Sequence, residues 1–128
     1  MIYIDSSVAL ARLLFEPRAP PSQFWQERLV SSRLLEYEIW NRVHAYNLNG
    51  SNQQVARTLL IGIELFEMDE RVLARALEPW PTPIRTLDAL HLATAVFLRR
   101  QGETVELASY DGRLITAAQA LGIPPAAL

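Results

Sequence analysis

The chain has 128 residues, which is the size of one ordinary domain, and its formal charge at pH 7 is −2. It contains no cysteine, and all 12 of its basic residues are arginine. Disulfides, cysteine-ligated zinc and every mechanism that needs a lysine, such as the Walker P-loop, are therefore excluded. The apolar runs are too short to span a bilayer, and no basic segment precedes the first of them. We expect a single domain over residues 1–128, with no membrane span and a cytoplasmic location.

Short apolar runs alternate with helical patterns along the chain. The opening run has no polar alternation, which is typical of a strand buried on both faces of a parallel sheet. Serine, threonine or aspartate precedes several of the helical patterns, and proline or glycine follows them. In chain order the patterns predict a strand at 2–4, a helix at 8–15, a short helix around Phe24 and Trp25, a strand at 28–31, a helix at 33–47, a helix from Ser51 to Glu64, a strand at 65–68, a helix from Asp69 to Leu77, a helix at 87–100, a strand at 104–109 and a helix from Asp111 to Leu121.

Two of these boundaries depend on particular caps. Ser51 and Gln54 have the spacing of a capping box, and Thr86 is expected to cap the helix at 87–100. That helix is rich in leucine and alanine on nearly all sides, so we expect it to be the most buried. Strands that alternate with helices indicate right-handed crossovers in a parallel sheet. The sequence therefore predicts a three-layer α/β/α domain with a central, mostly parallel sheet of four to five short strands.

Three of the four aspartates in the chain fall where a ligand would bind in such a sheet. Asp5 follows the first predicted strand and Asp111 the last, so both would project beyond the carboxyl ends of the strands. Asp88 lies in the first turn of the most apolar helix, and its helical neighbours include His91. Glu38 lies one turn into an earlier helix, on a face of mixed polarity.

Each of these acidic residues also has a structural explanation. Asp5 and Asp111 could be helix caps. Asp88 could interact with a helix dipole, and Glu38 could pair with Arg42. Four converging carboxylates would, however, raise one another's pKa unless a cation lay between them. Mg²⁺ or Mn²⁺, which prefer oxygen ligands, would remove that repulsion, so the sequence favours an acidic metal site.

Four stretches of the sequence resemble a known family. They are the opening IYIDSS, the segment SRLLEYE around Glu38, the run RTLDALHLATA around Asp88 and the segment SYDGRL around Asp111. Their order and spacing resemble those of PIN-domain ribonucleases, and most closely those of the VapC-type toxins of bacterial toxin-antitoxin pairs. The run around Asp88 is the most specific of the four.

The resemblance implies the fold predicted above and hydrolysis of RNA phosphodiester bonds by metal-activated water, with one or two Mg²⁺ or Mn²⁺ ions as cofactor. The family's acidic residues correspond here to Asp5, Glu38, Asp88 and Asp111. Ser6 corresponds to a small hydroxyl residue beside the first aspartate, where threonine is more usual. Glu36 lies only two residues from Glu38, but Glu38 fits the family's spacing to Arg42 better.

Basic residues near these motifs are candidates for RNA contacts. The four candidates are Arg12, Arg42, Arg85 and Arg113. Arg85 is the strongest because it directly precedes the helix that carries Asp88, whose N-terminus could also face a phosphate. His91 could hydrogen-bond near the site, although its apolar helix favours a buried structural role, and we expect His44 at the surface.

The resemblance also implies partners. VapC-type toxins usually form homodimers and bind an antitoxin, part of which lies in an apolar groove and often directs an arginine into the acidic site. We therefore expect an RNA substrate, a cognate antitoxin protein and a homodimer. The apolar residues Phe24 and Trp25, together with the stretch 59–65, exceed what a small core needs and are candidates for such contacts.

Three functions are compatible with these residues. The first is a metal-dependent endoribonuclease that acts as the toxin of a type II toxin-antitoxin pair. A housekeeping PIN nuclease in RNA processing would use the same residues and differ in genetic setting. A catalytically silent PIN-like module that binds protein or RNA would be expected to lack one of the acidic residues, and all four are present.

Overall fold

The computed structural model describes residues 1–128 and has a four-stranded parallel sheet at its centre. The strands are β1 (Ile2–Ile4), β2 (Leu29–Ser32), β3 (Ile63–Phe66) and β4 (Glu106–Ala108). Their order across the sheet is β3-β2-β1-β4, so the first strand lies between the second and the fourth. Ile2 pairs with Leu29 on one side and with Glu106 on the other. This register brings the carboxyl ends of β1 and β4 to the same edge.

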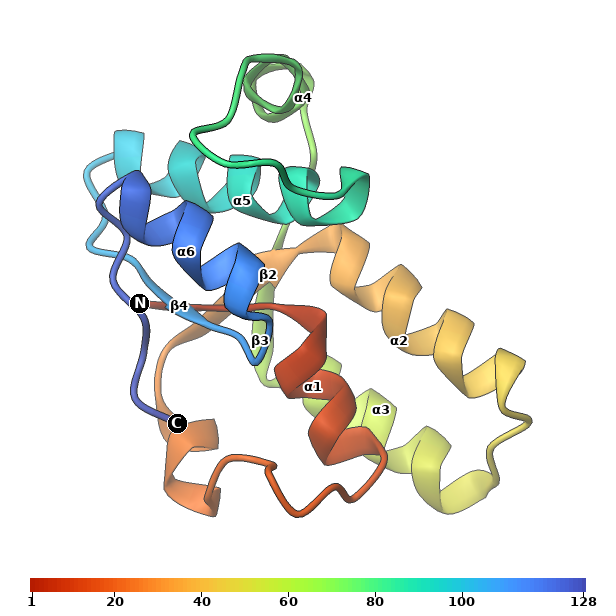
Figure 1. Ribbon diagram of the computed structural model, residues 1–128. Helices are drawn as coiled ribbons and strands as arrows, with labels where there is room; N and C mark the ends of the chain where they lie inside the picture. The colour runs from red at the N-terminus through yellow and green to blue at the C-terminus, as the bar shows by residue number, and fades with distance from the viewer.

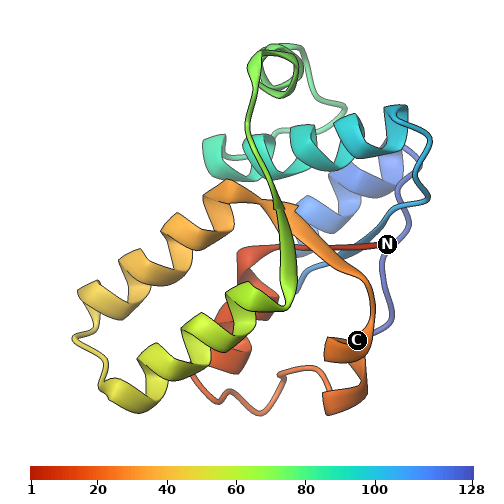
Figure 2. The ribbon, with the colours of Figure 1, turned by 180° about the vertical axis from the view of Figure 1, so that it is seen from behind.

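Helices cover both faces of the sheet. They are α1 (Ser6–Leu13), the short 3₁₀ helix η1 (Ser22–Gln26), α2 (Arg33–Ala45), α3 (Gly50–Ile61), α4 (Glu70–Leu77), α5 (Thr86–Arg100) and α6 (Gly112–Ala120). Figure 1 shows α1, α2 and α3 on one side of the sheet and α5 and α6 on the other. The view from behind in Figure 2 shows β3 leading from α3 to α4, which packs on the outer side of α5. The predicted three-layer α/β/α arrangement is confirmed.

The two faces of the sheet enclose two separate clusters of buried apolar side chains. Because side chains alternate along a strand, Ile4 joins the cluster under α1, α2 and α3, while its neighbour Tyr3 joins the cluster under α5 and α6. Both side chains are fully buried. β1 therefore has no solvent-facing side at its carboxyl end, and the backbone that leads into Asp5 is held in the middle of the protein.

The predicted starts of β3 and α3 are wrong, and burial or capping explains each. The third strand begins at Ile63 rather than at residue 65, because Ile63 is a core residue that pairs with Leu29. α3 begins before Ser51, because the side chain of Asn49 accepts hydrogen bonds from the backbone N–H groups of Ser51 (3.0 Å) and Asn52 (3.3 Å). The asparagine is therefore the cap, and the expected capping box does not form.

Two other helices also begin earlier than predicted. α1 begins at Ser6 because Asp5, rather than a serine, is its cap. Thr86 is the first residue of α5 rather than its cap, and Arg85 occupies the cap position without a side-chain hydrogen bond. α6 begins after Asp111, whose side chain caps it. Aspartates thus begin two of the helices that meet at the edge of the sheet.

The apolar residues expected at a partner surface lie mostly in the core. Phe24, Leu59 and Ile63 are buried between the sheet and the α1–α3 layer. Removal of their apolar surface from water stabilises the fold, so they are not available to a partner. Ile61 is 87% exposed, and Leu77 on α4 is 89% exposed.

None of the helices combines the length and the continuous apolar character that a bilayer crossing requires.

Candidate active site

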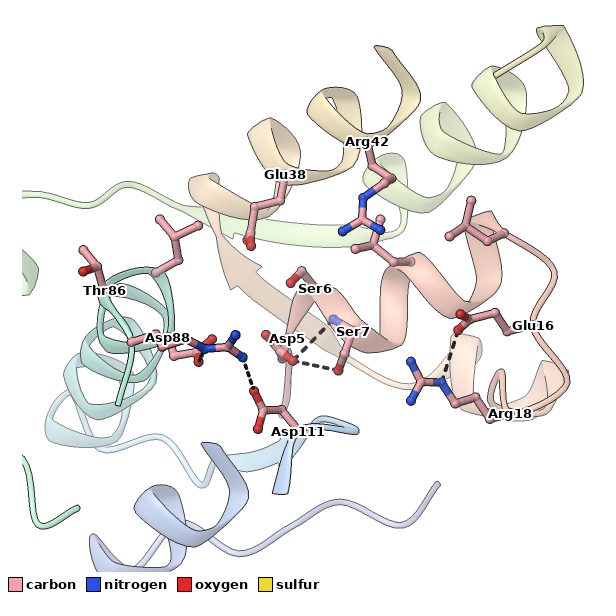
Figure 3. Close-up of a pocket in the computed structure, with 14 residues that line it drawn as sticks. Asp5, Ser6, Ser7, Glu16, Arg18, Glu38, Arg42, Thr86, Asp88 and Asp111 are labelled. Carbon is pink, nitrogen blue, oxygen red and sulfur yellow. Dashed lines mark hydrogen bonds and ion pairs between the residues drawn. The ribbon is translucent and has the colours of Figure 1, made fainter. Parts of the chain in front are cut away.

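A cleft of about 590 Å³ opens beyond the carboxyl ends of the central strands. Figure 3 shows acidic side chains that reach this cleft from separate parts of the chain. Four of them are the residues singled out from the sequence, namely Asp5, Glu38, Asp88 and Asp111. They come from the β1–α1 junction, from α2, from the first turn of α5 and from the β4–α6 junction. The parallel topology therefore brings together carboxylates that are far apart in the sequence.

Asp5 is the most deeply buried of the four, with 3% of its surface exposed. Its Oδ2 accepts hydrogen bonds from the backbone N–H (3.3 Å) and hydroxyl (2.7 Å) of Ser7, and from the hydroxyl of Ser109 (2.9 Å). Its Oδ1 has no hydrogen-bond partner in the chain. The carboxylate is thus fixed through one oxygen, and the other is available to a ligand.

The hydroxyls of Ser7 and Ser109 fasten two strand-helix junctions together. Ser109 donates to Asp5 and accepts from the backbone N–H of Asp111 (2.9 Å), while Ser7 accepts from the backbone N–H of Tyr110 (2.9 Å). Neither residue was singled out from the sequence, where the only signal was a serine at each junction. Ser6, which was singled out, lines the cleft, but its side chain makes no hydrogen bond in the chain.

Asp88 has unfavourable electrostatic surroundings. Burial raises the pKa of its carboxyl group above the ordinary value, and repulsion from Asp5 and Asp111 raises it further. Arg85 and His91 oppose these effects but do not cancel them. Burial together with like charges is one of the arrangements by which functional sites raise the pKa of a carboxyl group.

Arg85 connects two of the carboxylates. Its Nη2 lies 3.1 Å from Oδ2 of Asp111, and its Nε lies 3.5 Å from Oδ2 of Asp88. The other oxygen of Asp111 accepts a hydrogen bond from the backbone N–H of Arg113 (2.9 Å) and so caps α6. Because the side chain of Arg85 is 73% exposed, little packing holds it in this position.

Glu38 is held by a histidine rather than by an arginine. Its Oε1 lies 2.5 Å from Nε2 of His91, and it makes no ion pair with Arg42. Glu36, two residues earlier, pairs with Arg33 at 2.9 Å and does not line the cleft. His91 is buried, as its apolar helix indicated, and it also contacts the site.

Three arginines border the cleft. Arg42 and Arg85 were candidates from the sequence, whereas Arg18 was not singled out. Arg18 follows α1, pairs with Glu16 at 3.2 Å and stacks over the ring of Tyr110 at 4.7 Å. It lies outside the motifs, so only the path of the loop after α1 brings it to the cleft.

The other two candidate arginines lie outside the cleft. The guanidinium of Arg12 stacks over the ring of Trp25 at 4.6 Å. Arg113 lines a smaller hollow of about 170 Å³ next to the cleft, together with Arg85 and Asp88. Of the two, only Arg113 is close to the acidic residues.

His44 is exposed, as expected.

The acidic residues suit a hard divalent cation in their chemistry. Carboxylate oxygens are the ligands that Mg²⁺ and Mn²⁺ prefer, and a cation would relieve the repulsion that raises the pKa of Asp88. As the side chains stand, no three acidic or histidine residues are arranged around one ion. Arg85 instead supplies the positive charge beside Asp88 and Asp111. Metal binding at this edge would require these side chains to adjust.

The family model of the PIN domain matches residues 2–120, a span that contains the four carboxylates. The chain belongs to the PIN-domain family. The resemblance noted from the sequence is thus confirmed. Ribonuclease VapC47 of Mycobacterium tuberculosis (strain CDC 1551 / Oshkosh) is 31% identical over an alignment of 129 residues, and the match covers 95% of this chain and 93% of the relative. Ribonuclease VapC46 of Mycobacterium tuberculosis (strain ATCC 25618 / H37Rv) is 33% identical over 126 residues, with coverage of 95% and 93%.

A solved structure supports the fold independently. A chain of the toxin-antitoxin complex from Klebsiella pneumoniae superposes with a TM-score of 0.62, and the match covers 87% of each chain. The two sequences are 16% identical, so the match concerns the fold alone.

Proposed function

We propose that this PIN domain is an endoribonuclease that hydrolyses RNA phosphodiester bonds with Mg²⁺ or Mn²⁺, and that it is the toxin of a type II toxin-antitoxin pair. The observation that carries the proposal is the convergence of four carboxylates from four segments in one cleft. The similarity to the VapC ribonucleases supports RNA as the substrate. The cytoplasm, where RNA is abundant, is the proposed location.

We propose separate roles for the four carboxylates. Asp5, Asp88 and Asp111 would hold the ion or ions, and Glu38 would complete or orient the site. A bound divalent ion would lower the pKa of a water molecule and offset negative charge on the phosphate and the leaving oxygen. Asp5 has the least freedom, because two serine hydroxyls fix one of its oxygens. This restraint would limit the movement of Asp5 when a metal ion or substrate binds.

The arginines of the cleft would contact the phosphates of the substrate. Arg85 is exposed and already binds two carboxylate groups, so it can transfer its hydrogen bonds to a phosphate when a cation takes its place. Arg42 on α2 and Arg18 in the loop after α1 line the same cleft and would offer further phosphate contacts. Ser6, in contact with the same cleft, is the small hydroxyl beside Asp5. Contacts of this kind provide affinity without reading the base sequence.

A protein partner is supported by an apolar groove next to the cleft. The groove has a volume of about 390 Å³, and Leu73, Leu77, Trp80 and Ile84 are among its lining residues. Thr86 lines both the groove and the catalytic cleft, so a partner seated in the groove would lie beside the cleft. We propose a cognate antitoxin as this partner and a homodimer as the assembled form of the toxin.

Cleavage of total bacterial RNA tests the enzymatic proposal. The purified wild type is compared with Asp5→Asn and Asp88→Asn in Mg²⁺, Mn²⁺ or EDTA, and folding is checked by circular dichroism. Asp69→Asn is the matched control, because Asp69 caps α4 and does not line the cleft. We expect discrete fragments from the wild type and the control with metal, and a loss of about 10²-fold or more in the two cleft variants.

Two outcomes separate this proposal from the other functions. Equal cleavage by the wild type and the folded cleft variants would mean a contaminating nuclease and favour a silent binding module. Induction in a bacterial host tests the toxin role, because the wild type should arrest growth and Asp88→Asn should not. An active nuclease that leaves growth unaffected would point to a housekeeping role in RNA processing.

A further inference from the structure

A chain of buried hydrogen bonds runs from the core of the protein to the edge of the cleft. The backbone N–H of Ser32 donates to the hydroxyl oxygen of Tyr3 at 3.1 Å. That hydroxyl lies 2.8 Å from Nδ1 of His91, and Nε2 of the same ring lies 2.5 Å from Oε1 of Glu38. Tyr3 and His91 are almost completely buried, whereas Glu38 lines the cleft. The chain therefore connects β1 and α5 to a carboxylate of the proposed active site.

The Glu38 carboxylate only accepts hydrogen bonds, so Nε2 of His91 carries the hydrogen between them. Nδ1 and the Tyr3 hydroxyl form the second hydrogen bond of the ring, in which a neutral ring accepts and a protonated ring donates. Burial raises the pKa of Tyr3 far above its ordinary value, so the hydroxyl keeps its hydrogen. Because Ser32 donates to the same oxygen, the polar atoms of both buried side chains are satisfied.

The same contacts restrain α2 at two points. The hydroxyl of Ser32 accepts a hydrogen bond from the backbone N–H of Leu34 at 3.0 Å and thereby caps α2, while Glu38 lies farther along that helix. The segment from Ser32 to Glu38 is therefore held at one end by Tyr3 and at the other by His91. A free glutamate side chain samples several rotamers, whereas this one is held through Oε1, and Oε2 has no hydrogen-bond partner in the chain.

We propose that Tyr3 and His91 are positioning residues that hold the Glu38 carboxylate with Oε2 free to face the catalytic cleft. The inference rests on the proposed function, in which Glu38 completes the acidic site. Packing alone does not require an imidazole here, because an apolar side chain would fill the same space without burying two polar nitrogens. Figure 3 shows Glu38 directed from α2 toward the cleft that Asp5 borders.

Three substitutions test the contacts separately. His91→Leu removes both hydrogen bonds of the ring, His91→Gln keeps an N–H group that can reach Glu38, and Tyr3→Phe removes only a hydroxyl. Leu98→Val is the matched control, because Leu98 is buried on the same helix outside the hydrogen-bond chain. The measurements are kcat and KM for RNA cleavage, and Mn²⁺ affinity without RNA.

The expected result is a loss in kcat rather than in substrate binding. Groups that orient the ligands of a metal typically change metal affinity or activity by 10–100-fold. His91→Leu should therefore lower kcat by about 10- to 100-fold and weaken Mn²⁺ binding, with little change in KM. His91→Gln should recover part of the loss, Tyr3→Phe should have a smaller effect, and Leu98→Val should leave kcat unchanged.

A double variant distinguishes positioning from general damage to the fold. If His91 acts through Glu38, then His91→Leu should have little further effect on kcat in a Glu38→Gln background. Equal kcat values for His91→Leu and Leu98→Val would overturn the proposal. So would losses from His91→Leu and Glu38→Gln that multiply as if the two residues were independent.

Proton NMR provides a readout that does not depend on catalysis. The Nε2–H proton of His91 should resonate far downfield in the wild type and lose that shift in Glu38→Gln. If the wild type cleaves no RNA but shows this resonance, and His91→Leu weakens Mn²⁺ binding, the proposed function fails and the positioning role is supported. A wild type that cleaves RNA without this resonance, and is unaffected by His91→Leu, would overturn the positioning role alone.

Discussion

The N-terminal ends of α4 and α5 each carry an aspartate, and the two carboxyl groups are held in different ways. Asp69 accepts hydrogen bonds from the backbone N–H groups of Val72 (3.1 Å) and Arg71 (3.0 Å) and pairs with the Arg71 side chain. The Val72 contact, followed by the Arg71 side chain, lowers its pKa. The side chain of Asp88 makes no hydrogen bond within the chain and has only the exposed guanidinium of Arg85 nearby, at 3.5 Å, while burial and the neighbouring carboxylates raise its pKa. One carboxylate is satisfied by its own helix, and the other is suited to an external cation.

The largest expected difference between the two aspartates concerns stabilisation by a cation. A ligand that binds only the folded protein at 100 times its Kd stabilises it by about 2.7 kcal/mol. Thermal unfolding of the wild type should therefore shift upward with Mn²⁺, and Asp69→Asn should show the same shift. Asp88→Asn should show little or none. An equal shift in all three proteins would place the cation outside the cleft.

The second difference concerns pH in metal-free buffer. Because the pKa of Asp88 is raised on folding, the folded state binds its proton more tightly, and stability falls as pH rises from the ordinary aspartate pKa through the raised value. The lowered pKa of Asp69 has the opposite consequence: its contribution is lost as pH falls through the folded-state pKa. As pH rises over these ranges, the wild type should lose stability relative to Asp88→Asn and gain it relative to Asp69→Asn. Urea unfolding across acidic pH measures both slopes, and slopes of the same sign would contradict the comparison.

The smallest expected effect is that of Arg85→Gln, which removes the guanidinium beside Asp88. Exposed ion pairs contribute about 1 kcal/mol or less, so Arg85→Gln should lower metal-free stability only slightly. With saturating Mn²⁺ the difference from the wild type should disappear, because the ion replaces the lost positive charge. Arg12→Gln, away from the cleft, is the control for the loss of an arginine. A deficit that is equally large with and without Mn²⁺ would mean that Arg85 stabilises the fold in some other way.

The architecture and the convergence of the carboxylates could be predicted because they depend on local patterns. An apolar run followed by an aspartate places that aspartate at the carboxyl end of a strand, and a parallel sheet brings such ends together. Asp5 and Asp111 reach the cleft for this reason. Helix starts were less predictable, since Asn49 and Ser51 are both acceptable caps and the sequence does not rank them.

The partners that fix the acidic residues could not be predicted, although the sequence did suggest that His91 could hydrogen-bond near the site. The hydrogen bond from Ser109 to Asp5 joins residues 104 positions apart, and that from His91 to Glu38 joins residues 53 apart. Capping preferences and periodicity describe neighbours within about one turn, so they contain no information on such pairs. Arg18 shows the same limitation, because a loop rather than a motif brings it to the cleft.

The position of a bound ion tests the central claim most directly. An anomalous-difference map from crystals of the wild type grown with Mn²⁺ would locate the ion without reference to activity. We predict a peak among Asp5, Asp88 and Asp111, with the guanidinium of Arg85 displaced from its present contacts. A map without a peak in the cleft, at a Mn²⁺ concentration that raises the unfolding temperature, would contradict the assignment of these carboxylates as the metal site.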